Sequence, residues 1–147
     1  NLRIEELVIV VDTSYSTSGE LVKKFLRETF TILSETDSFF RKRKIHIIQC
    51  DELVHSDITV TGDTDIDILI NNFELAGGGN TDFRPAFEYV NNLIDTGEIK
   101  KLQGLLYFTD GKGKYPKKKM PYNTAFVFID KLSETAVPAW AMKVSLE

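Results

Sequence analysis

The stretch Leu7-Val8-Ile9-Val10-Val11-Asp12 decides the fold of this chain. A continuous apolar run rich in β-branched residues is typical of a strand buried on both faces, and such strands lie at the centre of parallel sheets. The run ends at the carboxylate of Asp12, and a hydroxyl-rich segment, Thr13-Ser14-Tyr15-Ser16-Thr17-Ser18, follows at once. The sequence therefore predicts a central parallel strand with a polar loop at its carboxyl end.

Strand-like and helix-like patterns alternate along the rest of the chain. Helical spacing of apolar residues predicts helices over 19–36, 65–73 and 84–94, and short apolar runs predict strands over 44–50, 53–60, 105–108, 125–129 and 139–144. Only Asp51-Glu52 separates the strands 44–50 and 53–60, which favours a hairpin with an antiparallel edge strand. We therefore expect an α/β fold whose open, mostly parallel six-stranded sheet has helices on both faces.

The length and composition fit one packed domain spanning residues 1–147. Hydrophobic residues make up 42% of the 147 residues, and the net charge of −4 is too modest to imply a nucleic-acid or membrane partner. No run is long enough to span a membrane, and no signal peptide opens the chain. The single cysteine, Cys50, cannot form an internal disulfide, so we expect a cytoplasmic protein. Its apolar neighbours favour a buried side chain. Because the chain starts at Asn1 and ends in Leu146-Glu147, we expect a domain excised from a longer protein.

Several oxygen-bearing side chains should meet at one edge of the sheet. Asp12, Ser14 and Ser16 follow the first strand, Thr81 follows a glycine-rich loop, and Asp110 follows the strand 105–108. The carboxyl ends of parallel strands share one edge, so residues far apart in sequence can surround one point there. Oxygen ligands without His or Cys suit a hard cation, Mg²⁺ before Mn²⁺ or Ca²⁺. Taken alone, the serines and threonines after Asp12 also fit a turn that caps the next helix.

Three separated motifs together resemble a known site. Asp12-Thr13-Ser14-Tyr15-Ser16, Thr81 after its glycine loop, and Thr109-Asp110-Gly111 resemble the metal-ion-dependent adhesion site of von Willebrand factor A domains, and the likeness covers essentially the whole chain. The resemblance implies the Rossmann-like A-domain fold. It also implies that Ser14 and Ser16 touch the metal directly, that Thr81 joins in the ligand-bound state, and that Asp12 and Asp110 act mainly through water.

The same resemblance implies a function. An inner shell without carboxylates leaves the cation in need of an anionic ligand, which the Asp or Glu of a protein partner can supply. We therefore expect a metal-dependent protein-binding module with no enzymatic activity of its own.

Further stretches resemble a narrower, bacterial group of A-like domains found at the C-terminus of metallopeptidase-related proteins. They are Cys50-Asp51, Gly77-Gly78-Gly79-Asn80-Thr81-Asp82-Phe83-Arg84-Pro85 and Tyr107-Phe108-Thr109-Asp110-Gly111. This resemblance implies an origin in the C-terminal part of a longer chain and an AAA+ ATPase as a partner. The sequence contains no His-Glu-x-x-His, so any peptidase activity would lie outside these residues.

Residues near the predicted metal site form a candidate partner rim. Tyr15 stands where the family usually has a small residue, and it either narrows access or contacts a partner. Asp82 is expected to cap the helix that follows it and less readily to touch metal. Lys112, Lys114 and Tyr115 belong to a lysine run that we place on the metal edge, where it is either a solvated loop or a basic rim that steers an acidic partner. Nucleic acid is weakly supported, because only Tyr115 could stack on a base.

Enzymatic alternatives fit the sequence less well. A Mg²⁺-dependent phosphoryl-transfer or hydrolytic enzyme using Asp12 and Asp110 is the main alternative, but a dehalogenase-like phosphatase needs a second acid where Ser14 stands. A serine nucleophile needs a base, and neither His46 nor His55 is expected at the carboxyl edge. No Gly-Lys-Ser/Thr follows the glycine run, which excludes a phosphate-binding P-loop.

Overall fold

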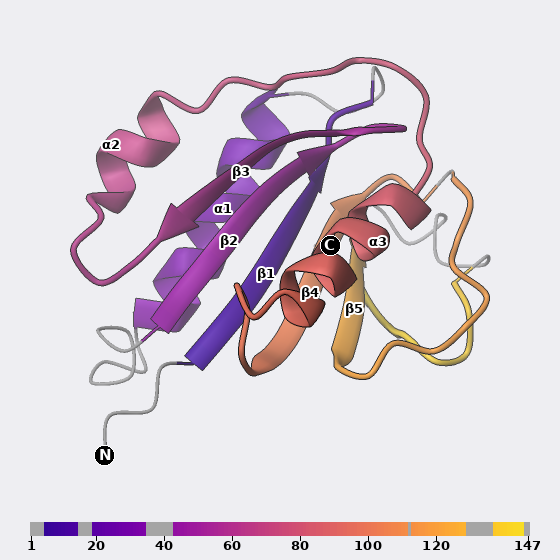
Figure 1. Cartoon of the computed structure of the whole chain (residues 1–147). Coiled ribbons are helices and arrows are strands. Elements are labelled where there is room, and N and C mark those ends of the chain that lie inside the picture. The colour runs from indigo at the N-terminus through magenta and orange to yellow at the C-terminus, as the bar shows by residue number, and fades with distance from the viewer. Residues whose placement is uncertain (1–4, 15–18, 35–42, 112, 129–136, 146–147) are drawn as a thin grey trace.

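The computed structural model contains one six-stranded sheet. It describes residues 5–14, 19–34, 43–111, 113–128 and 137–145. The strands are β1 (Glu5–Asp12), β2 (Arg43–Cys50), β3 (Val54–Val60), β4 (Leu102–Thr109), β5 (Asn123–Phe128) and β6 (Met142–Ser145). Their order is β3-β2-β1-β4-β5-β6 (Figure 1), with β3 antiparallel to β2 and all other neighbours parallel. The predicted mixed sheet with one antiparallel edge strand is confirmed.

Strand β1 lies in the middle of the sheet, as its apolar run predicts. It pairs with β2 on one side and with β4 on the other, and Val8, Val10 and Val11 are at most 1% exposed. The register sets Asp12 opposite Cys50 and Val11 opposite Phe108. The last residues of β1, β2 and β4 therefore end side by side at one edge.

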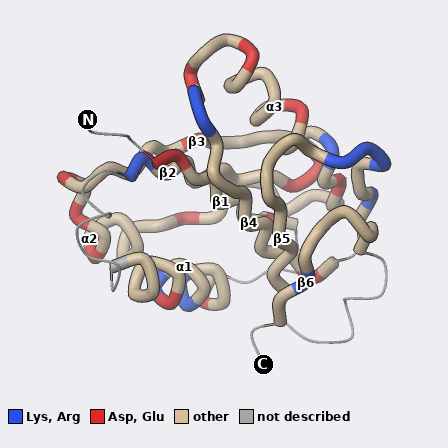
Figure 2. Tube along the Cα trace, turned by 90° about the horizontal axis from the view of Figure 1, so that it is seen from below, with Lys and Arg blue, Asp and Glu red and all other residues tan. Residues whose placement is uncertain are grey.

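Helices cover both faces of the sheet and create two hydrophobic cores. Helices α1 (Gly19–Ser34) and α2 (Ile66–Asn71) pack on one face, and α3 (Arg84–Asp95) packs on the other, as the view along the layers shows (Figure 2). On the α1 face, the rings of Phe25 and Phe108 stack with centroids 4.5 Å apart. On the α3 face, Phe87 packs against Tyr107 and Phe126. With both faces buried, the strand ends are left for binding.

Some element boundaries differ from those predicted. Helix α2 begins after its N-cap Asp65, whose Oδ1 accepts a hydrogen bond from the Ile68 N–H at 3.1 Å, and ends at Asn71 instead of 73. Strand β6 begins at Met142 instead of 139, because a turn in which the Ala141 N–H donates to the Pro138 carbonyl precedes it. Residues 35, 36 and 129, assigned to elements from the sequence, lie outside the described residues. None of the described helices is long and apolar enough to cross a membrane.

Candidate metal centre

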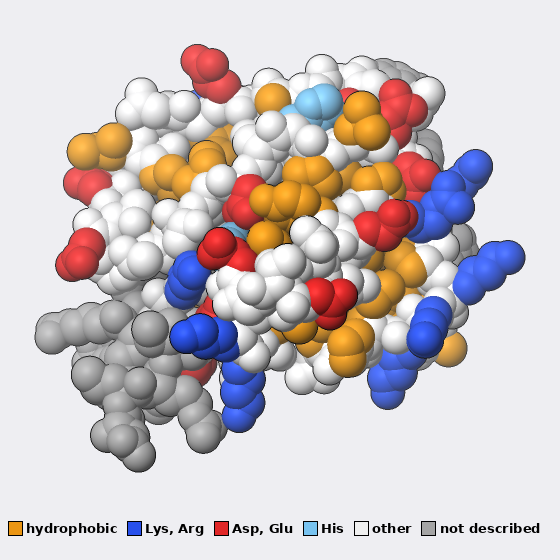
Figure 3. All heavy atoms as spheres, viewed as in Figure 1, with side chains coloured by type: hydrophobic (Ala, Val, Ile, Leu, Met, Phe, Trp, Pro, Cys, Tyr) orange, Lys and Arg blue, Asp and Glu red, His pale blue; other side chains and the backbone are white. Residues whose placement is uncertain are grey.

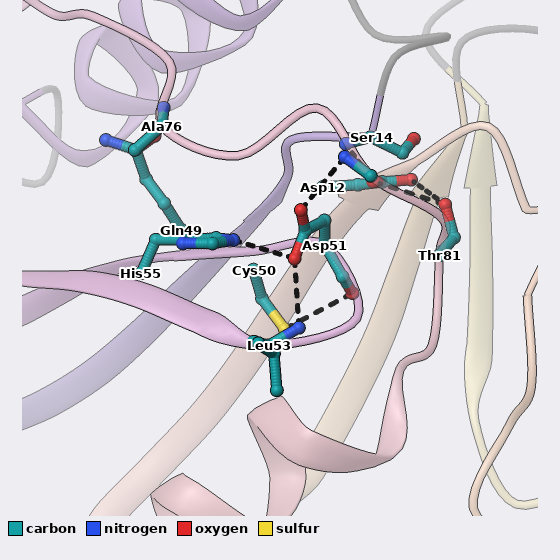
Figure 4. A network of polar contacts seen from close by, with 10 residues as sticks. Asp12, Ser14, Gln49, Cys50, Asp51, Leu53, His55, Ala76 and Thr81 are labelled. Atoms are coloured by element: carbon teal, nitrogen blue, oxygen red, sulfur yellow. Dashed lines mark hydrogen bonds and ion pairs between the residues drawn. The ribbon is translucent and has the colours of Figure 1, made fainter.

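The carboxylate of Asp12 is the innermost group of a polar cluster at the carboxyl edge of the sheet. Its side chain is 0% exposed. Its Oδ1 accepts a hydrogen bond from the Ser14 N–H at 2.9 Å, and its Oδ2 accepts one from the Thr109 hydroxyl at 2.7 Å. The Thr81 hydroxyl lies 3.5 Å from both carboxylate oxygens (Figure 4), the long limit of a hydrogen bond. Three loops distant in sequence thus meet at Asp12.

Burial governs the charge of the Asp12 carboxyl. Loss of solvent raises its pKa, hydrogen bonds from Thr109 and Ser14 lower it, and the nearby charge of Asp110 raises it, so that the net pKa is above its ordinary value. A buried carboxyl of this kind resists ionisation unless positive charge lies beside it. A divalent cation would supply that charge, so the electrostatics of the cluster fit a metal site.

Three other predicted ligands, Ser14, Thr81 and Asp110, lie in the part of the chain that the structure describes. Ser14 is buried, like Thr13 before it. Thr81 and Asp110 are partly exposed and form the solvent-facing side, or mouth, of the cluster. Ser16, Tyr15 and Lys112 lie outside the described residues. Within the described ranges, no group of three or more His, Cys, Asp or Glu side chains could hold a metal ion. Any metal here would therefore depend on hydroxyl ligands as well as carboxylates, which is a donor set that suits Mg²⁺.

Thr109 belongs to the cluster, although the sequence analysis gave it no role. Besides donating to Asp12, its hydroxyl accepts a hydrogen bond from the Gly111 N–H at 3.1 Å. The register already contains the signal: Val11 pairs with Phe108, so the next residue of β4 lies beside Asp12. Thr109 thereby links the end of β4 to the end of β1.

Asp51 ties down the loop that carries Thr81. Its Oδ1 accepts hydrogen bonds from the Leu53 N–H at 2.9 Å and from His55 Nε2 at 2.7 Å, and its Oδ2 accepts one from the Gly79 N–H at 3.0 Å (Figure 4). Its backbone carbonyl accepts the Asp82 N–H at 3.2 Å. Burial raises the pKa of this carboxyl, but its hydrogen bonds lower the pKa by a larger amount. The net pKa is therefore below the ordinary value. Asp51 is therefore ionised and holds the loop on both sides of Thr81.

The glycine run is needed for close packing against Asp51. Gly77 has a φ of +119°, and a Cβ added there would lie 2.7 Å from Thr13 Oγ1 and 2.9 Å from Asp51 Oδ2. Such contacts are closer than real Cβ atoms allow, and the backbone angle itself favours glycine. The loop can therefore approach Thr13 and Asp51 this closely at Gly77 only because that residue lacks a side chain.

The expected position of His55 is wrong. Because β3 runs antiparallel to β2, its first residues lie at the carboxyl edge, and His55 is among them. The ring bonds Asp51. His46 lies inside β2, as predicted, and its Nδ1 is 2.8 Å from Asp57 Oδ1.

Asp82 does not occupy the cap position predicted for it. The N-cap of α3 is Phe83, which makes no side-chain cap hydrogen bond. Asp82 stands one residue earlier, where its Oδ1 accepts the Arg84 N–H at 3.0 Å and its Oδ2 pairs with the Arg84 guanidinium at 2.8 Å. These hydrogen bonds, the guanidinium first, lower the pKa of the Asp82 carboxyl. Asp82 still stabilises the first turn of α3, but from outside the helix.

Lys114 lies near the carboxyl edge of the sheet but Lys118 and Lys119 do not, so our placement of the whole lysine run there is wrong. Lys114 is near that edge, since its carbonyl accepts the Phe83 N–H at 3.1 Å. The ring of Tyr115 packs 4.6 Å from that of Phe83, and its hydroxyl donates to the Gly111 carbonyl, so this residue braces the core more than it forms a rim. The chain then descends to the opposite end of the sheet, because β5 is parallel to β4 and must start there. Lys119 accordingly lies beside the beginnings of β4 and β5.

Comparison with known families identifies the domain. The family model described as a VWA-like domain (DUF2201) matches residues 7–147. The chain belongs to this VWA-like family. The resemblance to von Willebrand factor A domains is thereby confirmed at the level of family and fold.

Solved structures share the fold of this VWA-like domain at low sequence identity. The SpRpn10 VWA domain superposes with a TM-score of 0.62 at 14% identity, covering 97% of this chain and 88% of that one. The pilus adhesin SpaC from Lactobacillus rhamnosus GG superposes with a TM-score of 0.59 at 12% identity, covering 80% of this chain but only 16% of the adhesin. No curated protein sequence matches the chain. These likenesses establish the VWA fold, which is commonly a protein-interaction module.

Proposed function

We propose that this VWA-like domain is a protein-binding module that depends on a divalent cation. Asp12, Ser14, Ser16, Thr81 and Asp110 would hold the ion, Mg²⁺ in preference to Mn²⁺ or Ca²⁺. The observation that carries the proposal is the buried Asp12 carboxylate, which backbone and hydroxyl donors surround at a strand edge where Thr81 and Asp110 remain partly exposed. A partner bearing Asp or Glu would complete the site.

Each described residue has a distinct task in this proposal. Asp12 fixes the start of the serine loop through the Ser14 N–H and fixes β4 through Thr109. Thr81 stands at the mouth on a loop that Asp51 restrains. A bound cation would supply an electrophilic centre that accepts a partner's carboxylate. The chain's contribution is to present hydroxyls in a fixed arrangement around that centre.

The burial of Asp12 favours binding over catalysis. A carboxylate nucleophile or general base must reach the substrate. Asp12 is fully buried, and each of its oxygens accepts a hydrogen bond from the protein. We therefore propose that the domain is not an enzyme. The alternative is a phosphoryl-transfer or hydrolytic enzyme. Release of phosphate from a phosphoester in the presence of Mg²⁺, abolished by Asp12→Ala, would favour that alternative.

The wider setting is also a proposal and rests on the family resemblance alone. We propose that the domain works in the bacterial cytoplasm, at the C-terminal part of a longer metallopeptidase-related protein. An AAA+ ATPase is the partner that this setting favours. Co-purification of such an ATPase with the full-length protein in the presence of Mg²⁺, and its release by EDTA, would support this assignment.

Calorimetry with a carboxylate ligand tests the proposed binding. Titration of Mg²⁺ into the protein, with and without a short Glu-containing peptide, should show binding that the peptide strengthens. Ser14→Ala should weaken Mg²⁺ binding by about tenfold or more, since it removes an oxygen ligand. Thr31→Ala, on the exposed surface of α1, is the matched control and should leave binding unchanged. Equal Mg²⁺ affinity in wild type and Ser14→Ala would refute the proposal.

A further inference from the structure

A groove lies at the end of the sheet opposite the metal centre. It runs past the beginnings of β4 and β5 as two adjoining hollows of about 450 and 300 Å³, which share Lys119, Met120 and Pro121. Lys101, Gln103 and Asn123 line the first hollow, and Asn91, Ile94 and Asp95 at the end of α3 line the second. Neither hollow takes part in the proposed metal site.

Hydrogen bonds of buried and partly buried side chains hold both walls of the groove in place. On one side, Glu6 is 6% exposed, and its Oε1 accepts the N–H groups of Lys100 and Lys101 at 2.9 and 3.1 Å. On the other side, Asn91 donates to the sulfur of Met120 at 3.6 Å and accepts the Tyr122 hydroxyl at 3.1 Å. The groove is therefore preformed, which lowers the entropic cost of binding.

The groove is rimmed by positive charge on a chain that is negative overall. Exposed lysines stand on the two loops that enter β4 and β5, namely Lys100, Lys101, Lys117, Lys118 and Lys119. Figure 3 shows Lys and Arg side chains at the lower left and along the right side of the view, with hydrophobic side chains between the two groups. Among the residues that the structure describes, Asp95 is the one carboxylate that lines the two hollows. With a net charge of −4 for the whole chain, this local excess of lysines is a distinct electrostatic feature.

We propose that this groove binds an acidic peptide segment of a protein partner, independently of the metal centre. Carboxylates of such a segment would pair with the lysines on the rim, and its apolar side chains would contact Ile94, Met120 and Pro121. A peptide can place an uncharged residue beside Asp95, whereas a nucleic acid carries a charge at every phosphate. The aromatic residue that lines the groove, Tyr122, is 9% exposed with its hydroxyl bonded to Asn91, so it offers no stacking platform for bases.

Fluorescence anisotropy with a defined probe tests the proposal. The probe is a short fluorescein-labelled peptide of Glu, Asp and Leu, compared with a peptide of the same length in which Lys replaces the acids. Wild-type protein should bind the acidic peptide in EDTA, and its affinity should fall as the salt concentration rises. It should not bind the basic peptide. Lys118→Glu with Lys119→Glu should weaken binding by about tenfold or more.

Matched variants separate this groove from the metal centre. Lys24→Glu with Lys143→Glu makes the same charge change at exposed positions on α1 and β6 and should change affinity by less than about twofold. Ser14→Ala should bind the peptide like wild type, even if the metal-dependent function proves wrong. The proposal would be overturned by the absence of saturable peptide binding, by its loss in EDTA, or by equal losses of peptide affinity in both double variants. It would also be overturned if an oligonucleotide or anionic vesicles displaced the peptide at lower concentrations than unlabelled peptide does.

Discussion

At the scale of single residues, Thr109 joins the two central strands β1 and β4 beside the proposed metal site. Its hydroxyl is buried, donates to Asp12 and accepts from the Gly111 N–H. The sequence predicts Asp12 and Asp110 as site residues because carboxylates are common metal ligands. It gives no such signal for Thr109, the last residue of β4. What distinguishes Thr109 is its neighbour in the sheet, and only the strand register gives that.

Replacing the hydroxyl of Thr109 tests this role. Thr109→Val keeps the shape of the side chain but leaves one Asp12 oxygen and the Gly111 N–H without their partner, which should lower the free energy of unfolding by about 1–3 kcal/mol. Urea unfolding measures the loss, and Mg²⁺ affinity should fall with it. Thr124→Val is the control, since this buried hydroxyl donates only to the Tyr122 carbonyl at 3.3 Å, away from the cluster. A larger loss in the control would contradict the role of Thr109.

Two neighbouring glycines separate close packing from backbone conformation. Gly77 and Gly78 both have positive φ angles, +119° and +104°, but an added Cβ would clash only at Gly77, while nothing lies within 4 Å of one at Gly78. Gly78→Ala should therefore cost about 1 kcal/mol of stability from backbone strain alone, and Gly77→Ala should cost more. Thermal and urea unfolding of both variants would decide, and equal losses would show that contact with Thr13 and Asp51 is unimportant.

At the scale of elements, a partly buried polar network ties α3 to the antiparallel hairpin. Asp57 on β3 lies 2.8 Å from the Nδ1 of His46 on β2 and accepts the Tyr89 hydroxyl of α3 at 2.6 Å. Burial raises the pKa of the Asp57 carboxyl, but the hydrogen bonds from His46 and Tyr89 outweigh it, so the net pKa is lowered. Burial, followed by Asp57, raises the pKa of Tyr89 to about 12.

This network predicts how stability changes with pH. A carboxyl whose pKa is lowered by folding contributes its full stability above its ordinary pKa of 3.8 and loses it as the pH falls through the lowered value. Wild type should therefore exceed Asp57→Asn in unfolding free energy at neutral pH, and the difference should shrink below about pH 4. Urea unfolding from acid to neutral pH measures it. The exposed Asp67→Asn on α2 is the matched control for the loss of a carboxylate, and a constant difference for Asp57→Asn would contradict the account.

Most elements were predictable, and the exceptions share a cause. The β-branched run of β1 and the short link between β2 and β3 suffice to predict a parallel centre and an antiparallel edge strand. The position of His55 was missed although the predicted antiparallel hairpin already places the start of β3 at the carboxyl edge. Lys119 was misplaced because a loop between parallel neighbours must travel the height of the sheet. Both positions follow from the direction of the chain in the predicted topology, and not from the local residue patterns around His55 and Lys119.

At the scale of the whole molecule, the two ends of the sheet have different characters. The carboxyl end gathers Asp12, Ser14, Thr81 and Asp110 into a partly buried oxygen cluster, and the amino end presents lysines around a groove. The predicted cluster needed only the parallel topology, whereas the groove needed the packing of the loops that enter β4 and β5. One VWA-like domain could thus engage a partner at both ends.

The central claim is that a cation sits among the oxygens at the end of β1. Anomalous X-ray scattering from crystals of the domain grown with Mn²⁺ tests it most directly. We predict an anomalous peak at about 2.0–2.3 Å from the Ser14 hydroxyl, lost in Ser14→Ala crystals grown under the same conditions. Absence of any peak near Ser14 and Thr81 at saturating Mn²⁺, or a peak beside Asp51 and His55 instead, would contradict the account.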